Sequence, residues 1–299
     1  DGKKNGKWTW WNEHGQILRK ENYKDGKKNG KWNWWNEHGQ ILKEENYKDG
    51  KKNGKFTSWY DNGQIQNEGN YKEGSLVSKT RYEYYTNGQI KSEKNYKDGN
   101  LVSQTQYVYN DNFQILFIRN YSGLPNDNNL VSETRYTYHE DGRIKREANF
   151  KNGKLVSQTR HTYNYNKQIK NKRNFKNGKL VSQTDYYYYE NGQILKEENY
   201  KDGKKNGKFT SWYGNGQIKL EENYIDGKKN GKWTTWHENG QLLKEENYKD
   251  GKKNGKFTSW HENGQIKSEE NYKDGKKDGN WTNWHENGSK HAERFYKDD

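Results

Sequence analysis

The feature that most constrains this chain is a repeat of 24 or 25 residues that runs through all 299 of them. Its clearest copy extends from Tyr47 to Tyr71. A fixed period of this size is typical of repeat architectures, in which each unit is one supersecondary element stacked on its neighbours. One interval is longer, at 29 residues, because Leu124–Asp127 is inserted. The aromatic residues that close the copies are Tyr23, Tyr47, Tyr71, Tyr96, Tyr121, Phe150, Phe175, Tyr200, Tyr224, Tyr248, Tyr272 and Tyr296.

Each copy has the pattern of a β-hairpin. Two runs rich in aromatic and β-branched residues, Lys55–Tyr60 and Gln64–Tyr71, flank Asn62-Gly63. Asn-Gly between alternating runs favours a two-residue type I′ turn, in which both residues have φ > 0. A longer return loop, residues 48–54, leads to the next hairpin. We therefore predict an all-β fold: an elongated antiparallel meander of about twelve tandem hairpins in a single-sheet ribbon.

This turn sets the predicted register of the hairpin. It pairs Tyr60 with Ile65, Trp59 with Gln66, Ser58 with Asn67 and Thr57 with Glu68. Because side chains alternate between the two faces of a strand, each residue can be assigned to a face. We expect one face to hold Phe56, Tyr60, Ile65 and Tyr71, and the other to hold Thr57, Trp59, Glu68 and Asn70.

The composition requires an unusual core. Leu, Ile, Val and Phe are scarce and the net charge is +14, a combination that by itself is typical of disordered chains. Aromatic residues, however, make up 15% of the chain and recur at fixed positions. Since Tyr and Trp bury large areas, we predict a core of stacked aromatic ladders. The chain contains no cysteine, which excludes disulfides and thiolate metal sites.

The repeat changes along the chain, although we expect one continuous array over residues 1–299. Residues 1–75 and 200–299 carry a Trp-rich version in which Gly-Lys-Trp or Gly-Lys-Phe starts the first strand. Residues 76–199 carry a Leu-Val-Ser-x-Thr-x-Tyr-x-Tyr version without the second loop glycine. The only proline, Pro125, lies in the insertion, which we interpret as a tolerated surface loop.

Alternation places one column of rings on the face of Trp59, and this column is the first candidate binding surface. We call it the aromatic face. Its members are Trp11, Trp35, Trp59, Tyr82, Tyr84, Tyr107, Tyr109, Tyr136, Tyr138, Tyr163, Tyr186, Tyr188, Trp212, Trp236, Trp260 and Trp284.

The return loops give a second candidate surface. In a meander all return loops lie on one edge and all Asn-Gly tips on the other, so lysines collect on one edge and Glu or Asp on the other. Equivalent residues of adjacent hairpins stand roughly 9.6 Å apart. Such a basic rim suits an acidic protein face, anionic lipid or acidic glycan, but it would equally keep the edge soluble. Its lysines are Lys27, Lys28, Lys51, Lys52, Lys204, Lys205, Lys228, Lys229, Lys252 and Lys253.

The sequence predicts no catalytic site, cofactor or metal site. Catalysis needs a singular constellation of groups, whereas almost every Glu, Asp and Ser here is one copy of a ladder. His237, His261 and His285 repeat every 24 residues, too far apart in the ladder to share one ion, so we interpret them as turn-flanking residues. Asn precedes the closing aromatic in eleven of the twelve copies and Glu stands three positions before it in nine; both are interpreted as structural. Rare arginine and the lack of a known module make nucleic acid an improbable partner.

Two segments of the repeat carry a family resemblance. Gly54-Lys55-Phe56-Thr57-x-Trp59-Tyr60-x-Asn62-Gly63-Gln64-Ile65 and Glu68-x-Asn70-Tyr71-Lys72-x-Gly74 resemble the variant MORN repeat of bacterial YwqK-like proteins, which are often described as antitoxin components. The resemblance spans the chain and is weakest over 76–190. It implies a hairpin ribbon that binds proteins or membrane phospholipid without catalysis. The repeats also resemble the hairpins of choline- or glucan-binding wall proteins.

Several functions remain open at this stage. We expect a non-enzymatic adhesion or interaction module that binds a protein or cell-surface ligand through the aromatic face or the basic rim. The alternatives are a toxin-neutralising partner and peripheral binding to anionic membrane or glycan. The chain has no methionine and opens inside a return loop, so we expect a processed product, secreted or at the cell surface; an antitoxin would be cytoplasmic. No run is apolar enough to span a membrane.

Overall fold

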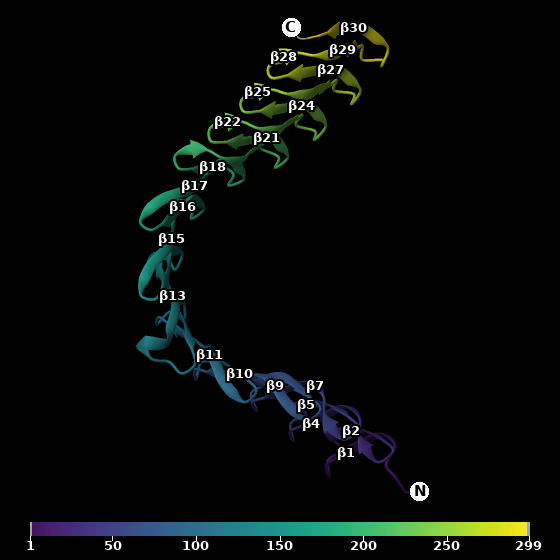
Figure 1. The fold of residues 1–299 in the computed structure, drawn as a ribbon, viewed down its shortest axis with the longest axis vertical. Helices are drawn as coiled ribbons and strands as arrows, with labels where there is room; N and C mark the ends of the chain where they lie inside the picture. Colours follow the sequence, from purple (N-terminus) through teal and green to yellow (C-terminus); the bar gives the residue numbers. More distant parts are fainter. Residues whose placement is uncertain (1, 298–299) are drawn as a thin grey trace. The chain divides into compact units, whose positions relative to one another are not determined.

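The computed structural model describes residues 2–297, and apart from one 3-10 turn its regular elements are all strands. The strands belong to one antiparallel sheet. The chain divides into two compact units, Asp1–Thr137 with Asn149–Lys154 and Tyr138–Ala148 with Leu155–Asp299. Within each unit, consecutive hairpins lie side by side in chain order (Figure 1). The predicted meander of tandem hairpins is therefore confirmed.

The elements follow one another without crossovers. From the N-terminus they are β1 (Gly6–Trp11), β2 (Ile17–Lys24), β3 (Lys27–Lys28), β4 (Gly30–Trp35), β5 (Ile41–Lys48), β6 (Lys51–Lys52), β7 (Gly54–Trp59), β8 (Ile65–Lys72), β9 (Ser75–Tyr84), β10 (Ile90–Lys97), β11 (Asn100–Tyr109), β12 (Ile115–Ser122), the 3-10 turn η1 (Asp127–Asn129), β13 (Leu130–Tyr138) and β14 (Ile144–Lys151). The remaining strands are β15 (Lys154–Tyr163), β16 (Ile169–Lys176), β17 (Lys179–Tyr188), β18 (Ile194–Lys201), β19 (Lys204–Lys205), β20 (Gly207–Trp212), β21 (Ile218–Ile225), β22 (Lys228–Lys229), β23 (Gly231–Trp236), β24 (Leu242–Lys249), β25 (Lys252–Lys253), β26 (Gly255–Trp260), β27 (Ile266–Lys273), β28 (Lys276–Lys277), β29 (Gly279–Trp284) and β30 (Lys290–Tyr296).

The register of the hairpin β7–β8 agrees with the prediction except next to the turn. Thr57 pairs with Glu68 and Ser58 with Asn67, as predicted, but a bulge then pairs Trp59 with Ile65. The predicted pairs Trp59–Gln66 and Tyr60–Ile65 are therefore wrong. Because opposite residues share a face, Ile65 lies with Trp59 and not with Phe56.

The tip turn explains this difference. The Tyr60 nitrogen donates to the Gln64 carbonyl at 2.8 Å, and the Gly63 nitrogen donates to the Tyr60 carbonyl at 2.9 Å. Of the two predicted turn residues only Gly63 has positive φ, at 83°. The Asn62 side chain instead accepts from the Gln64 nitrogen at 3.1 Å. The tip is thus a three-residue loop ending on a left-handed glycine, which adds the bulge.

The two-residue turn lies at the opposite end of the hairpin. Asp49 and Gly50 both have positive φ, at 49° and 86°, and they join the paired residues Lys48 and Lys51. This is the dihedral pattern of a type I′ turn. The predicted return loop is therefore itself a tight hairpin. Asn53 links its short strand β6 to β7, which begins at Gly54.

The core is a ladder of aromatic rings on the face of Phe56 and Tyr71, which we call the ladder face. The rings of Phe56 and Tyr71 are 5.1 Å apart, which confirms that these two residues share a face. Tyr60 does not join them: its ring contacts Tyr84 of the aromatic face at 6.0 Å. In the second unit an unbroken run of neighbouring rings links Tyr200, Phe209, Tyr224, Trp233, Tyr248, Phe257, Tyr272, Trp281 and Tyr296.

These rings replace an aliphatic interior. Phe209 is 2% exposed, and Trp233 and Phe257 are also buried. Edge-to-face pairs at such distances each contribute about 0.5–1.5 kcal/mol beyond area burial. In three central repeats an arginine, Arg81, Arg135 or Arg160, replaces the first-strand ring. The guanidinium carbon of Arg135 lies 4.3 Å from the ring centre of Phe150.

The repeated Asn has the structural role expected for it. The Asn46 side-chain nitrogen donates to the Lys55 carbonyl at 2.7 Å, and Asn247 donates likewise to Lys256. In the central repeats Asn95 accepts from Thr80 at 2.9 Å instead. Each of these three Asn side chains therefore joins its own strand to a neighbouring one.

Candidate functional site

The aromatic face is only partly accessible. Trp11 is exposed, whereas the other residues assigned to this column are half-buried. The threonine two positions before the Trp is buried in several repeats, as for Thr57 and Thr234. Lysines and glutamates cover the same face in ion pairs: Lys31–Glu44, Lys55–Glu68, Lys208–Glu221, Lys232–Glu245 and Lys256–Glu269.

The central tyrosines of this face link each repeat to the preceding one. The Tyr82 hydroxyl donates to Glu68 at 2.7 Å, and the Tyr107 hydroxyl donates to Glu93 at 2.9 Å. Burial and the contact with Glu93 raise the pKa of Tyr107 to about 12. The hydroxyls of four further tyrosines donate to backbone carbonyls of the preceding repeat; these are Tyr84, Tyr109, Tyr163 and Tyr188. The polar ends of these rings are thus used within the sheet.

The lysines of the basic rim divide into two kinds. The first lysine of each pair is exposed, and no ion pair involves it among residues 2–297; these are Lys27, Lys51, Lys204, Lys228 and Lys252. The second is half-buried and lies over the ring ladder: Lys28, Lys52, Lys205, Lys229 and Lys253. Of these ten lysines, only the first set is left free on the basic edge, a division that the sequence pattern alone did not reveal.

Lys52 also completes a buried carboxylate site. Glu45 is 2% exposed; Lys52 and Lys43 contact it at 2.7 and 2.8 Å, and the Tyr47 hydroxyl donates to it at 2.6 Å. Burial raises the pKa of Glu45, but these three partners outweigh burial and lower it to about 2. The charged carboxylate therefore belongs to the core of the ladder face.

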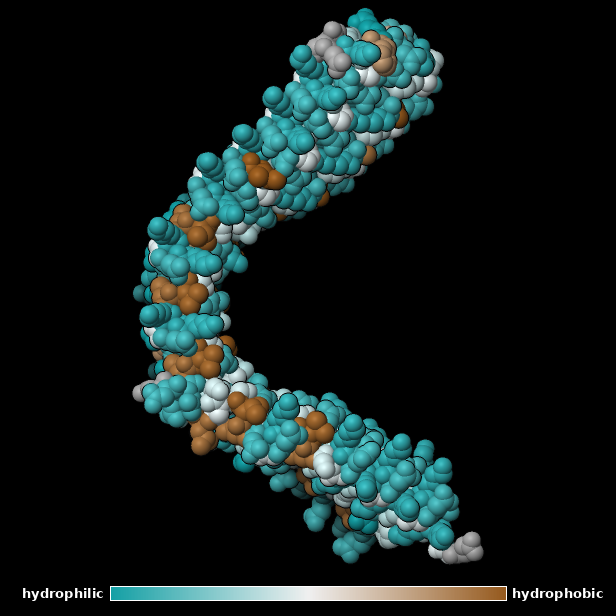
Figure 2. Space-filling view, viewed as in Figure 1, coloured by the Kyte–Doolittle hydropathy of each residue, from teal (hydrophilic) through white to brown (hydrophobic). Residues whose placement is uncertain are grey.

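The return-loop edge changes character in the central repeats. There Leu76 takes the pairing position of Lys52, opposite the closing aromatic, and Val77 is the extra residue of a bulge. The bulged valines are exposed, at 40% for Val77, 46% for Val102 and 42% for Val131. Figure 2 shows apolar side chains gathered over the central strands, while the outer repeats are mostly hydrophilic.

Two clefts lie between neighbouring tips. One, of about 520 Å³, lies between the tips that follow β15 and β17 and is lined mainly by tyrosines: Tyr163, Tyr165, Tyr186, Tyr188 and Tyr189. A second, of about 670 Å³, lies between the tips that follow β7 and β9 and includes Tyr60, Asp61, Arg81, Tyr84 and Tyr85. Sequence analysis missed Tyr165. Its signal was an aromatic residue at a tip position that is acidic in most other copies, such as Asp61.

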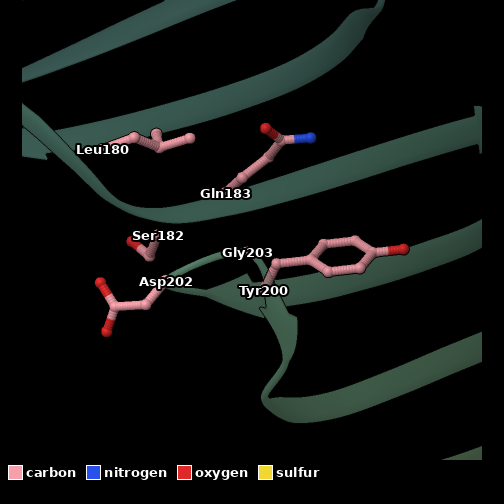
Figure 3. Close-up of a pocket in the computed structure, with 6 residues that line it drawn as sticks. All are labelled: Leu180, Ser182, Gln183, Tyr200, Asp202 and Gly203. Carbon is pink, nitrogen blue, oxygen red and sulfur yellow. The ribbon is translucent and has the colours of Figure 1, made fainter. Parts of the chain in front are cut away.

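A smaller hollow of about 280 Å³ lies on the return-loop edge, where Leu180, Ser182 and Gln183 face Tyr200 and Asp202 (Figure 3). It marks the change from the central to the outer type of repeat. The hollow contains one carboxylate, one amide and two hydroxyls, of which that of Tyr200 donates to Glu198 at 2.7 Å. It holds no pair of groups suited to acid–base or nucleophilic chemistry.

The histidines lie at the hairpin tips. His237 and His261 hold the position of Tyr60, and the His261 ring contacts the Trp284 carbonyl at 3.0 Å. Among residues 2–297, no three His, Asp or Glu side chains gather as metal ligands would. Within the same range, no helix has the length and apolarity needed to cross a membrane.

The hairpin repeats match a known family of sequences. The model described as "MORN repeat variant" matches residues 4–25, 28–49, 52–73, 79–98, 134–152, 186–202, 205–226, 229–250, 253–274 and 277–298. The chain belongs to the MORN repeat variant family. MORN repeats are non-catalytic scaffolds that generally serve protein or membrane interaction. The segments left out of the match lie mostly in the central repeats, where the second loop glycine is missing.

Solved structures show only a distant likeness. The chain is similar to part of a chain in the crystal structure of TcdB2-TccC3-Cdc42 (13% identity, TM-score 0.42, 95% of this chain and 15% of that chain) and of TcdB2-TccC3 (13%, 0.42, 96% and 17%). A Bacteroides fragilis protein of unknown function aligns at 10% identity and a TM-score of 0.13 over 57% of this chain and 91% of that chain. The MORN chain thus spans less than a fifth of the first two. No curated protein matches it.

Proposed function

We propose that this MORN chain is a non-enzymatic interaction module whose protein partner docks on the exposed lysines of the return-loop edge. The observation that carries the proposal is the division of the loop lysines. One lysine of each pair stabilises the ring ladder, while its neighbour, such as Lys228 beside Lys229, has no partner in the described structure. The second lysine of each pair thus serves the fold, whereas the first recurs along the return-loop edge and is free to contact a partner.

The spacing of this row indicates the kind of partner. Equivalent lysines in adjacent hairpins stand roughly 9.6 Å apart, which suits an extended acidic protein surface that several ammonium groups contact at once. Complementary charge of this kind accelerates association and rejects partners of the wrong sign. The interaction should therefore weaken as salt rises.

We place this module outside the cell or on its surface, as an adhesion or interaction protein. The lack of cysteine and the array of accessible lysines are compatible with that location. A cytoplasmic toxin-neutralising role is the competing proposal. Restored growth on co-expression with a neighbouring toxin would support that role, and an export signal in the gene would oppose it.

The test uses the whole chain and two triple variants of equal charge. Lys204→Ser/Lys228→Ser/Lys252→Ser removes exposed lysines from the edge. Lys208→Ser/Lys232→Ser/Lys256→Ser removes lysines that pair with Glu221, Glu245 and Glu269 on the aromatic face. Capture from a cell-surface extract should retain a partner with the wild type and the second variant and lose it with the first. Equal capture by both variants would contradict the proposal.

An anionic membrane is the second candidate, because exposed valines interrupt the lysines on the return-loop edge. Val77, Val102 and Val131 are exposed in the first unit, beyond Lys27 and Lys51. Near an anionic bilayer each lysine contributes about 1 kcal/mol, and the exposed valines insert into the membrane interface. Co-sedimentation with phosphatidylserine vesicles, lost in high salt and in Val77→Ser/Val102→Ser, would favour this candidate. Sedimentation that ignores lipid charge would eliminate it.

A further inference from the structure

The tyrosine cleft between the tips at residues 163–166 and 186–190 lies on the edge opposite the lysines, so it is independent of the proposed protein interaction. At about 520 Å³ it falls within the size range of small-ligand pockets. Its wall combines aromatic rings with the amides of Asn164 and Asn166 and two opposite charges, Lys170 and Glu190. Rings that supply area and a few polar groups that fix orientation are typical of such sites.

Most of these rings are held in place. The hydroxyls of Tyr163 and Tyr188 donate to the carbonyls of Ile144 and Ile169 at 2.8 and 2.9 Å, and that of Tyr189 donates to Trp212 at 2.8 Å. Because each hydroxyl is bonded to backbone, each ring stays in one orientation. A ligand therefore meets a surface that needs no reordering on binding.

Tyr165 is the exception. It is 88% exposed, and no hydrogen bond or ring contact involves it among residues 2–297. Two positions later Lys167 has φ of 65°, where most tips have glycine; a non-glycine residue in this conformation costs roughly 1–2 kcal/mol. One tip thus departs from the repeat at two positions. Departures from local rules without a structural gain tend to mark functional sites.

The chemistry of the wall selects the ligand. The C–H faces of a pyranose ring pack flat on phenol rings, and its hydroxyls can both donate to and accept from the Asn166 amide. The Asn164 amide is already bonded to Gln168. A quaternary ammonium also fits a tyrosine cage, but Lys170 lies in the wall and the Arg143 guanidinium carbon lies 4.1 Å from the Tyr163 ring centre. With one positive and one negative group in the wall, a neutral ligand is favoured. We propose that this cleft binds a neutral oligosaccharide that stacks on Tyr165.

The first unit provides an internal comparison. Its cleft has the same place between two tips, but Asp61 holds the position of Tyr165, and Arg81 and Glu83 contribute charge. It lacks the exposed ring on which a sugar would stack. We expect saccharide contacts to map to the cleft of Tyr165 and not to this one.

Calorimetry and saturation-transfer NMR on the full chain test the proposal with tetrasaccharides of β-1,4-glucose, α-1,4-glucose, β-1,4-N-acetylglucosamine and β-1,4-galactose, and with choline chloride. At least one tetrasaccharide should bind. Tyr165→Ala should weaken its affinity by about tenfold or more, equivalent to 1.4 kcal/mol, and Tyr165→Phe should preserve that affinity. Phe113→Ala, which removes an exposed tip ring of the first unit, is the matched control and should leave affinity unchanged. The proposal would be overturned if none of the four sugars binds, if Tyr165→Ala leaves the affinity unchanged, or if choline binds and the sugars do not.

Discussion

The ammonium of Lys229 lies 3.9 Å from the centre of the Trp233 ring and 4.7 Å from that of Tyr248. Its neighbour Lys228 is exposed and has no such contact. The same division recurs at Lys204–Lys205 and Lys252–Lys253. Adjacent residues of one type thus alternate between the ladder face and solvent, as the pleat of a strand requires.

This contact predicts unequal effects of two adjacent substitutions. Lys229→Ser should lower the free energy of unfolding by about 1–2 kcal/mol, because a half-buried ammonium over two rings is lost. Lys228→Ser should change it by less than about 0.5 kcal/mol. Urea unfolding followed by tryptophan fluorescence measures both. Equal losses would show that Lys229 does not stabilise the ladder.

The ring ladder predicts a large but local cost for removing one ring. Phe257→Ala should destabilise its surroundings by about 3–5 kcal/mol, since Phe257 is 3% exposed and lies between Tyr248 and Tyr272. Each repeat contacts only its neighbours. Hydrogen exchange should therefore accelerate in β24–β27 and stay unchanged in β1–β12. Phe295→Ala, at a ring 70% exposed, is the control and should have little effect.

Glu45 predicts acid sensitivity of the first unit. Its pKa is lowered from the ordinary 4.5 to about 2, so its contribution is complete above the unfolded-state value and is lost as the pH falls from about 4.5 to 2. Glu45→Gln should flatten stability over this window and reduce stability at neutral pH. Denaturant midpoints measured at pH 7, 4.5, 3 and 2 test this. If Glu45→Gln loses stability between pH 4.5 and 2 as steeply as the wild type, Glu45 is not the source of the acid sensitivity.

Lys167 predicts a stabilising substitution. Its φ of 65° is strained for a side chain with a Cβ, whereas glycine adopts it freely. Lys167→Gly should raise the free energy of unfolding by about 1 kcal/mol. The comparison is Gly63→Ala, at φ of 83°, which should lower it by a similar amount. Thermal unfolding of both variants in parallel checks the two signs.

The sequence allowed prediction of the repeat, the hairpin and the pairs Thr57–Glu68 and Ser58–Asn67, because period and alternation are properties of the backbone. It misassigned the two turns. Asn62-Gly63 and Asp49-Gly50 both suit a type I′ turn, and only the hydrogen bond from the Gln64 nitrogen to Asn62 favours the three-residue loop at the tip. The three-residue loop adds a bulge beside the tip, and this bulge moves Ile65 and Tyr60 to the face opposite the one predicted.

The candidate surfaces were only partly predictable for a similar reason. Composition shows that lysines collect in return loops, but not that Lys205 lies over Phe209 and Tyr224 while Lys204 does not. That distinction depends on a short strand, β19, which pairs with β18 and fixes the alternation. The tip clefts also escaped prediction, because they form between residues of different repeats.

The central claim is that adjacent loop lysines differ in accessibility. Its most direct test treats the native chain with a limiting amount of acetylating reagent and measures the acetylation rate of each lysine by mass spectrometry. Lys204, Lys228 and Lys252 should react fast, and Lys205, Lys229 and Lys253 slowly, with the difference abolished in urea. Equal native rates within each pair would contradict the division between an exposed binding edge and lysines held over the aromatic ladder.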